Sequence, residues 1–123
     1  MIYTITIPGR LPGLNDMIRQ AKQGRRNYQP YALQKAIHTD TVACLCKAAH
    51  IPRLERVAVR AYWMEPNRKR DPDNVTAAIK YILDGMVKAN VIPDDNQRHV
   101  DTIFHKVDVD KHNPRIVVEI EEV

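Results

Sequence analysis

The chain has 123 residues, of which 44% are hydrophobic, and its 19 Lys and Arg against 15 Asp and Glu give a net charge of +4. This length suits one domain, and the apolar fraction is ordinary for a globular protein, which argues against a disordered chain. No apolar run approaches the roughly 20 residues of a membrane-spanning helix, and the alternating N-terminus is unlike a signal peptide. We therefore expect a single domain over residues 1–123, with no membrane partner, in the cytoplasm.

The first half of the chain contains three segments whose sequence indicates a helix or a strand. Apolar and polar side chains alternate over residues 2–7, which predicts a strand. The basic, polar stretch 10–29 has the composition of a loop with at most one short helical turn. Residues 31–49 carry most of a helical apolar stripe, and residues 57–64 are rich in strand-forming side chains. We therefore predict a strand, a loop, a helix and a second strand.

The second half begins with the clearest helix. Apolar residues recur at i, i+3, i+4, i+7 and i+8 over 74–88, and Asp73 stands where an N-cap residue belongs. Segments 99–109 and 115–123 both alternate, and the turn-forming residues 110–114 between them predict a β-hairpin. The whole order predicts an α+β fold, with a mixed sheet of about four strands and two main helices on one face.

Charged side chains are unevenly distributed along the sequence. Basic residues gather in two stretches, Arg19, Lys22, Arg25 and Arg26 in the predicted loop and Arg68, Lys69 and Arg70 before the second helix. Acidic residues gather in two pairs, Asp71 with Asp73 and Asp94 with Asp95. A basic surface with a small acidic focus suits a nuclease, because cations bind phosphates and carboxylates bind a metal ion. The alternative is that the basic stretches are simply solvated loops.

The segment Asp71-Pro72-Asp73 holds two carboxylates at a stiffened corner, because proline restricts its own backbone and that of the residue before it. Magnesium ions prefer such oxygen ligands. In the plainer interpretation, Asp73 only caps the helix and Asp71 is a solvated turn residue. Asp95 would have to fold back along a helix of about 24 Å to join them. Lys80 either reaches a bound phosphate or pairs with Asp84 at i,i+4.

Together these residues resemble the signature of the RusA family of Holliday junction resolvases. The signature covers residues 68–96 and comprises Arg70-Asp71-Pro72-Asp73-Asn74, Lys80, Asp84-Gly85 and Ile92-Pro93-Asp94-Asp95. One departure is visible. The family lysine follows the second aspartate by one helical turn, where this chain has Ala77, and Lys80 comes one turn later with its spacing to Asp84 preserved.

The resemblance implies a structure-selective endodeoxyribonuclease that resolves four-way DNA junctions in recombination and repair. It also implies a RusA-like fold, a homodimer that makes paired nicks, and Mg²⁺ with Mn²⁺ as a substitute. No organic cofactor is expected. By motif match, the catalytic residues would be Asp71, Asp73, Asp95 and Lys80, and the metal ligands would be Asp71, Asp73, Asp95 and Asp94. The two basic stretches would bind DNA. Two alternatives remain open, a non-catalytic basic DNA-binding module and a metal-dependent nuclease for other branched DNA.

Overall fold

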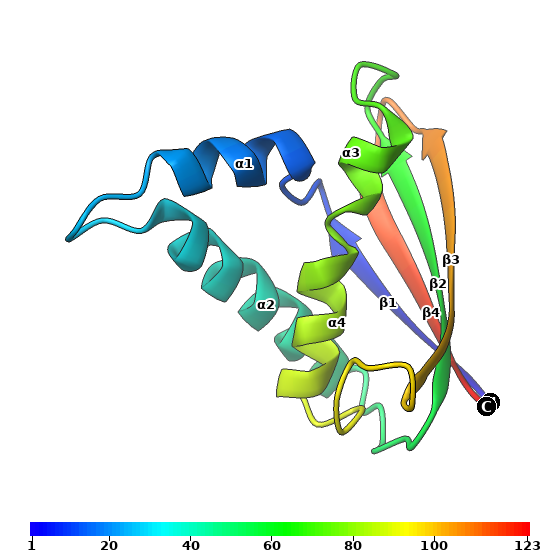
Figure 1. Ribbon diagram of the computed structural model, residues 1–123. Coiled ribbons are helices and arrows are strands. Elements are labelled where there is room, and N and C mark those ends of the chain that lie inside the picture. The colour runs from blue at the N-terminus through cyan, green and yellow to red at the C-terminus, as the bar shows by residue number, and fades with distance from the viewer.

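A computed structural model describes residues 1–123 as four strands and four helices. In chain order they are β1 (Ile2–Pro8), α1 (Leu14–Lys22), α2 (Pro30–Ala48), β2 (Val57–Glu65), α3 (Pro72–Thr76), α4 (Ile79–Lys88), β3 (Val100–Val109) and β4 (Arg115–Glu122). The strands form one sheet in the order β1-β4-β2-β3, in which β2 and β3 are parallel and the other pairs antiparallel. Helices α2 and α4 cover one face of this sheet (Figure 1). The predicted α+β class with a four-stranded mixed sheet is therefore confirmed. No helix has both the length and the apolar character needed to cross a bilayer.

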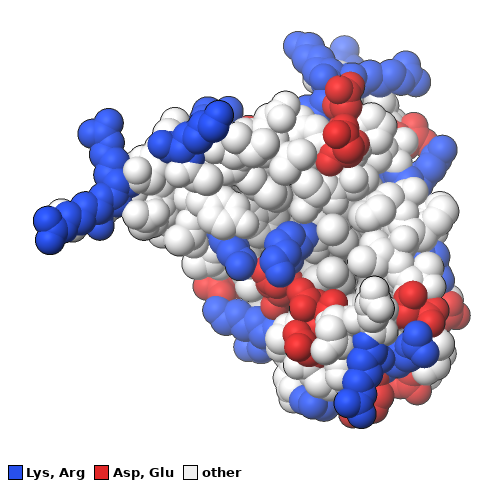
Figure 2. All heavy atoms as spheres, viewed as in Figure 1, with Lys and Arg blue, Asp and Glu red and all other residues white.

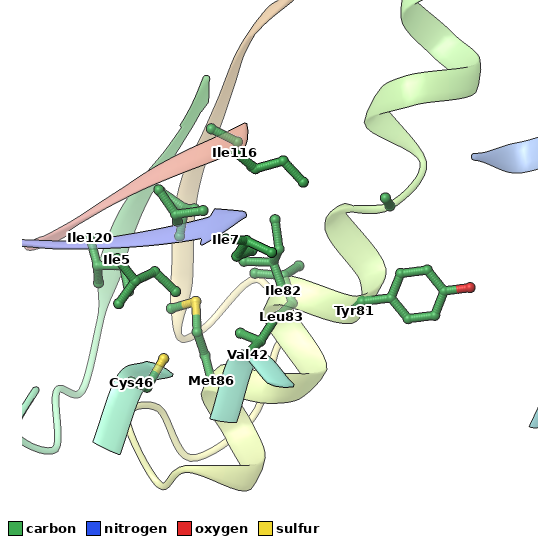
Figure 3. Packing of buried hydrophobic residues seen from close by; sticks show 14 of the residues in the cluster. Ile5, Ile7, Val42, Cys46, Tyr81, Ile82, Leu83, Met86, Ile116 and Ile120 are labelled. Atoms are coloured by element: carbon green, nitrogen blue, oxygen red, sulfur yellow. The ribbon is translucent and has the colours of Figure 1, made fainter. Parts of the chain in front are cut away.

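The core lies between the sheet and the two covering helices. Every second residue of β2 is buried, because successive side chains of a strand point to opposite faces of the sheet. From the helical side, Ile82 and Met86 of α4 and Val42 of α2 are fully buried. Figure 3 shows Ile82 and Met86 among the isoleucines of β1 and β4. Burial of these side chains fixes both helices on the sheet, because apolar area removed from water is the main favourable contribution to folding.

The predicted hairpin between residues 99–109 and 115–123 is wrong. The chain does reverse at residues 110–114, but β3 and β4 do not pair with each other. Instead β2 lies between them, parallel to β3 and antiparallel to β4. The most deeply buried strand thus takes an interior position, where both of its edges find hydrogen-bond partners.

The expected loop over 10–29 contains a nine-residue helix, α1. Leu14, Met17, Ile18 and Ala21 have helical spacing, although the surrounding charges hide it. The helix begins after Gly13, whose backbone N–H donates to Asp16 Oδ2 at 2.9 Å. Residues 14–22 are therefore helical because their apolar spacing and an acidic first turn both favour it.

The helix predicted over 74–88 is divided into α3 and α4 by a break at Ala77 and Ala78. Around the break the backbone bonds span three residues, with Lys80 N–H donating to Ala77 O at 3.3 Å. Such bonds tighten the helix locally. The N-cap residue is Asp71, with Pro72 first in the helix, so the predicted cap at Asp73 is displaced by two residues. Proline is favoured at that first position because its missing N–H has no intrahelical partner to lose.

Gly85 lets α4 approach α2 closely. A Cβ atom added at Gly85 would lie 2.5 Å from Val42 Cβ and 3.0 Å from the Thr39 carbonyl oxygen. We expect Gly85→Ala to lower the free energy of unfolding by about 1–3 kcal/mol, because overpacking outweighs the better helix propensity of alanine. Urea denaturation measures this change. Adding Val42→Ala should recover part of the loss, whereas a Gly85→Ala variant as stable as the parent would contradict the close contact.

Candidate functional site

The first acidic pair, Asp71 and Asp73, lies at the start of α3. Asp71 has extended backbone angles, and Pro72 turns the chain directly into the helix. Both carboxylates are exposed, and neither has a hydrogen-bond or ion-pair partner within the chain. Because no intramolecular contact engages their oxygens, both remain available to an external cation or a water molecule.

A buried ion pair holds the base of this corner. Arg70 donates from Nε to Glu65 Oε1 and from Nη2 to Glu65 Oε2, both at 2.9 Å. Its Nη1 donates to the Leu11 carbonyl oxygen at 3.1 Å, and Arg10 donates to Glu65 Oε1 at 3.0 Å. Burial alone would raise the pKa of Glu65, which is 4% exposed, but the hydrogen bonds from Arg70 and Arg10 hold that pKa below its ordinary value.

This ion pair changes the role expected for Arg70, which was predicted to bind DNA, and it adds Glu65 to the site. The guanidinium of Arg70 is engaged inside the protein, so it is less available to DNA phosphates than the exposed Arg68 and Lys69. Sequence reasoning missed Glu65. A signal was present, because Glu65 continues the inward-facing alternation of β2, where a carboxylate requires a cationic partner.

The N-terminal end of α1 is attached to the same corner. Asn15 N–H donates to Asn74 Oδ1 at 2.9 Å. A Cβ atom added at Gly13 would lie 2.5 Å from the same oxygen, so the backbone approaches Asn74 where no other residue fits. The helix and the acidic corner therefore form one unit.

Helices α1 and α2 project together from the body, and Lys and Arg side chains surround their tip (Figures 1 and 2). Lys22, Arg25 and Arg26 are exposed there without ion-pair partners. Arg19 differs, because its Nη2 contacts Asp16 Oδ1 at 3.0 Å. The projection thus presents a cluster of free positive charge.

The second acidic pair lies in the turn after α4, beside a hollow of about 520 Å³ between α2 and α4. Asp94 Oδ1 accepts the Asp95 N–H at 2.8 Å, which fixes the turn. Lys80 Nζ lies 3.2 Å from Asp84 Oδ1 and 3.5 Å from Asp95 Oδ2. The hydrogen bond from Lys80 to Asp84 is the main cause of a raised pKa at Lys80. Lys80 and Asp95 are therefore brought together, and Lys80 also forms the i,i+4 pair with Asp84.

The two acidic pairs do not meet. Asp71 borders a hollow with Arg68 and Asp108, whereas Asp94 and Asp95 border the hollow between α2 and α4. Figure 2 shows acidic side chains at separate places on this face. No group of three or more His, Cys, Asp or Glu side chains is placed to hold a metal ion. The oxygen donors suit Mg²⁺ chemically, but the geometry of the single chain does not fit the expected shared site.

The fold and these charges define a small α+β domain, with one helix-covered sheet face and two acidic pairs among basic residues. The model of the family described as endodeoxyribonuclease RusA matches residues 14–121, and the chain belongs to that family. No curated protein matches the chain. Family membership makes the chain a nuclease of the Holliday junction resolvase type, which acts on branched DNA. The family in general uses divalent metal ions.

Proposed function

We propose that this protein is a magnesium-dependent endodeoxyribonuclease that resolves four-way DNA junctions during recombination and repair. The observation that carries the proposal is the exposed, unpartnered pair Asp71 and Asp73, held at a rigid corner beside the free cations Arg68 and Lys69. Phosphodiester hydrolysis requires neutralisation of charge on the phosphoryl group, and a divalent ion provides it when bound. We propose Mg²⁺, with Mn²⁺ as a substitute, from the donor chemistry and the family.

The proposed roles of individual residues follow from their surroundings and from the family motif. Asp71 and Asp73 are proposed as catalytic acids and metal ligands because their exposed carboxylates have no partner in the chain. Asp95, assisted by Asp94, is proposed for the same roles from the motif match alone, because this pair lies at a separate hollow. Lys80 supplies a point charge for the phosphoryl group or the leaving oxygen. Exposed cations bind the junction backbone, namely Arg68, Lys69, Lys22, Arg25 and Arg26. Arg19 and Arg70 are also expected to bind DNA. Their guanidinium groups are held in place by ion pairs, Arg19 with Asp16 and Arg70 with Glu65, and we propose that they contribute to DNA binding from these positions.

We also propose that the working unit is a homodimer. A four-way junction is two-fold symmetric and requires two matched nicks, which a dimer with two-fold symmetry provides. Apolar side chains on the projecting helices support this proposal, because Ile18, Leu33 and Ile37 are 45%, 54% and 47% exposed. Leu33 and Ile37 lie one helical turn apart on α2, and neighbouring exposed apolar side chains commonly mark an interaction surface.

The experiment that tests this proposal is cleavage of a synthetic mobile four-way junction. We expect paired nicks with Mg²⁺ or Mn²⁺ and none after chelation with EDTA, because the acidic residues alone cannot neutralise the phosphoryl charge. Fork, duplex and single-stranded substrates at equal salt concentration measure selectivity. Binding without cleavage in either metal would identify a non-catalytic DNA-binding module. Equal cleavage of forks and junctions would identify a nuclease for other branched DNA.

A further inference from the structure

Asp84 lies between two lysines that come from different helices. Its Oδ1 is 3.2 Å from Nζ of Lys80 on α4, and its Oδ2 is 3.6 Å from Nζ of Lys35 on α2. The Asp84 side chain is only 20% exposed, compared with 50% for Lys80. Each carboxylate oxygen therefore faces one ammonium group, and the carboxylate is fixed from both sides.

The close packing of α2 and α4 makes this bridge possible. Gly85, the next residue, lets the α4 backbone approach Val42 and Thr39 of α2. Asp84 Oδ2 is consequently buried and has no hydrogen-bond partner, so Lys35 is its cationic neighbour. Burial of a carboxylate oxygen in this way is costly, and stability alone gives little reason for an acid at this position.

Lys80 depends on such a bridge for its position. A lysine ammonium sits on a flexible four-carbon stem, and half of this side chain is exposed. Its contacts are Asp84 and Asp95, and Asp84 gives the shorter distance. Without Asp84, the ammonium would retain only the longer contact to a turn residue.

We propose that Asp84 is a positioning residue, which is braced by Lys35 and holds the Lys80 ammonium beside Asp95. This inference rests on the proposed function, in which Lys80 stabilises charge on the phosphoryl group. Asp84 itself touches neither substrate nor metal in this role. It acts through Lys80, and loss of its charge leaves the lysine present but displaced.

The test compares Asp84→Asn with Asp40→Asn. Asp40 forms an ion pair with Lys88 in the same hollow, also between α2 and α4, but does not contact Lys80. For Asp84→Asn we expect kcat for junction cleavage to fall about 10- to 100-fold, as misplaced catalytic groups do. KM and metal-free junction binding should stay unchanged. Asp40→Asn should keep the parent kcat.

Three further measurements separate positioning from a structural role. Nitrogen-15 relaxation of lysine ammonium groups should show that Lys80 is more mobile in Asp84→Asn than in the parent protein. In Asp40→Asn the mobility of Lys80 should equal that of the parent. Asp84→Glu should restore part of kcat. Adding Asp84→Asn to Lys80→Met should cause no further loss, because the two residues act as one unit.

Equal losses of kcat in Asp84→Asn and Asp40→Asn would overturn the proposal, and so would an unchanged kcat or unchanged Lys80 mobility in Asp84→Asn. The ammonium measurement needs no substrate. If the parent protein failed to cleave junctions, the proposed function would fail, while the mobility of Lys80 would still decide whether Asp84 positions it.

Discussion

Asp73→Asn is expected to lower junction cleavage by about 1,000-fold or more, equivalent to about 4 kcal/mol of transition-state stabilisation. The substitution removes one negative charge from the exposed pair and keeps the shape of the side chain. Folding should change little, because the Asp73 carboxylate has no partner in the chain. At most about 1 kcal/mol of favourable interaction with the helix N-terminus is lost. Single-turnover cleavage of a labelled junction measures the effect.

Asp108→Asn is the matched control for this experiment. Asp108 is exposed and borders the same hollow as Asp71, but it is not among the proposed ligands. Both substitutions weaken the local negative charge equally, so both should leave metal-free junction binding intact or slightly tighter. Only Asp73→Asn should abolish cleavage. Parent-like cleavage by Asp73→Asn would remove Asp73 from the site, and equal losses in both variants would indicate a general effect of charge.

The elements that the sequence predicts well are those with one dominant local signal. Alternation identifies β1, the abundance of strand-forming side chains identifies β2, and the apolar stripe identifies α2 and most of the α3–α4 segment. Helix α1 was predicted as a loop because its many charged residues suggest a loop, although its apolar residues have helical spacing. The hairpin prediction was wrong for another reason. A turn at 110–114 shows that the chain reverses, but it does not show whether another strand lies between the two strands that it connects.

In the candidate site, too, the sequence predicts some features and not others. The corner at Asp71 and Asp73 follows from local chemistry, since Asp-Pro-Asp before a helix fixes its own geometry. Contacts between distant segments are different. The pairing of Asp84 with Lys35, or of Glu65 with Arg10, depends on which helix faces are packed together. Such contacts follow from tertiary packing, which no short motif encodes.

Glu65→Gln is expected to lower the free energy of unfolding by about 3–5 kcal/mol, because the largely buried Arg70 loses its two-pronged carboxylate partner and keeps only the longer ion pair with Asp16, at 3.8 Å. Glu65 receives hydrogen bonds from Arg70 and Arg10 and is 4% exposed. The same pair anchors the segment that leads to Asp71, so cleavage at temperatures where the variant is folded should also fall. Urea denaturation at pH 7 measures the stability, and it should be repeated at lower pH.

The sign of the pH dependence follows from the lowered pKa of Glu65. In the unfolded chain the carboxyl titrates near its ordinary value, about 4.3, and in the folded protein it titrates lower. Its contribution to stability is therefore complete above the unfolded pKa and is lost as the pH falls through the folded pKa. The gap between the parent and Glu65→Gln should stay constant from pH 7 to about pH 5 and shrink below.

Replacing Glu65 and Arg70 together by Leu and Met should cost less than Glu65→Gln alone, because the double variant also removes the weakly paired charge of Arg70. A gap below about 1 kcal/mol, or one that widens on acidification, would show that this ion pair does not stabilise the corner.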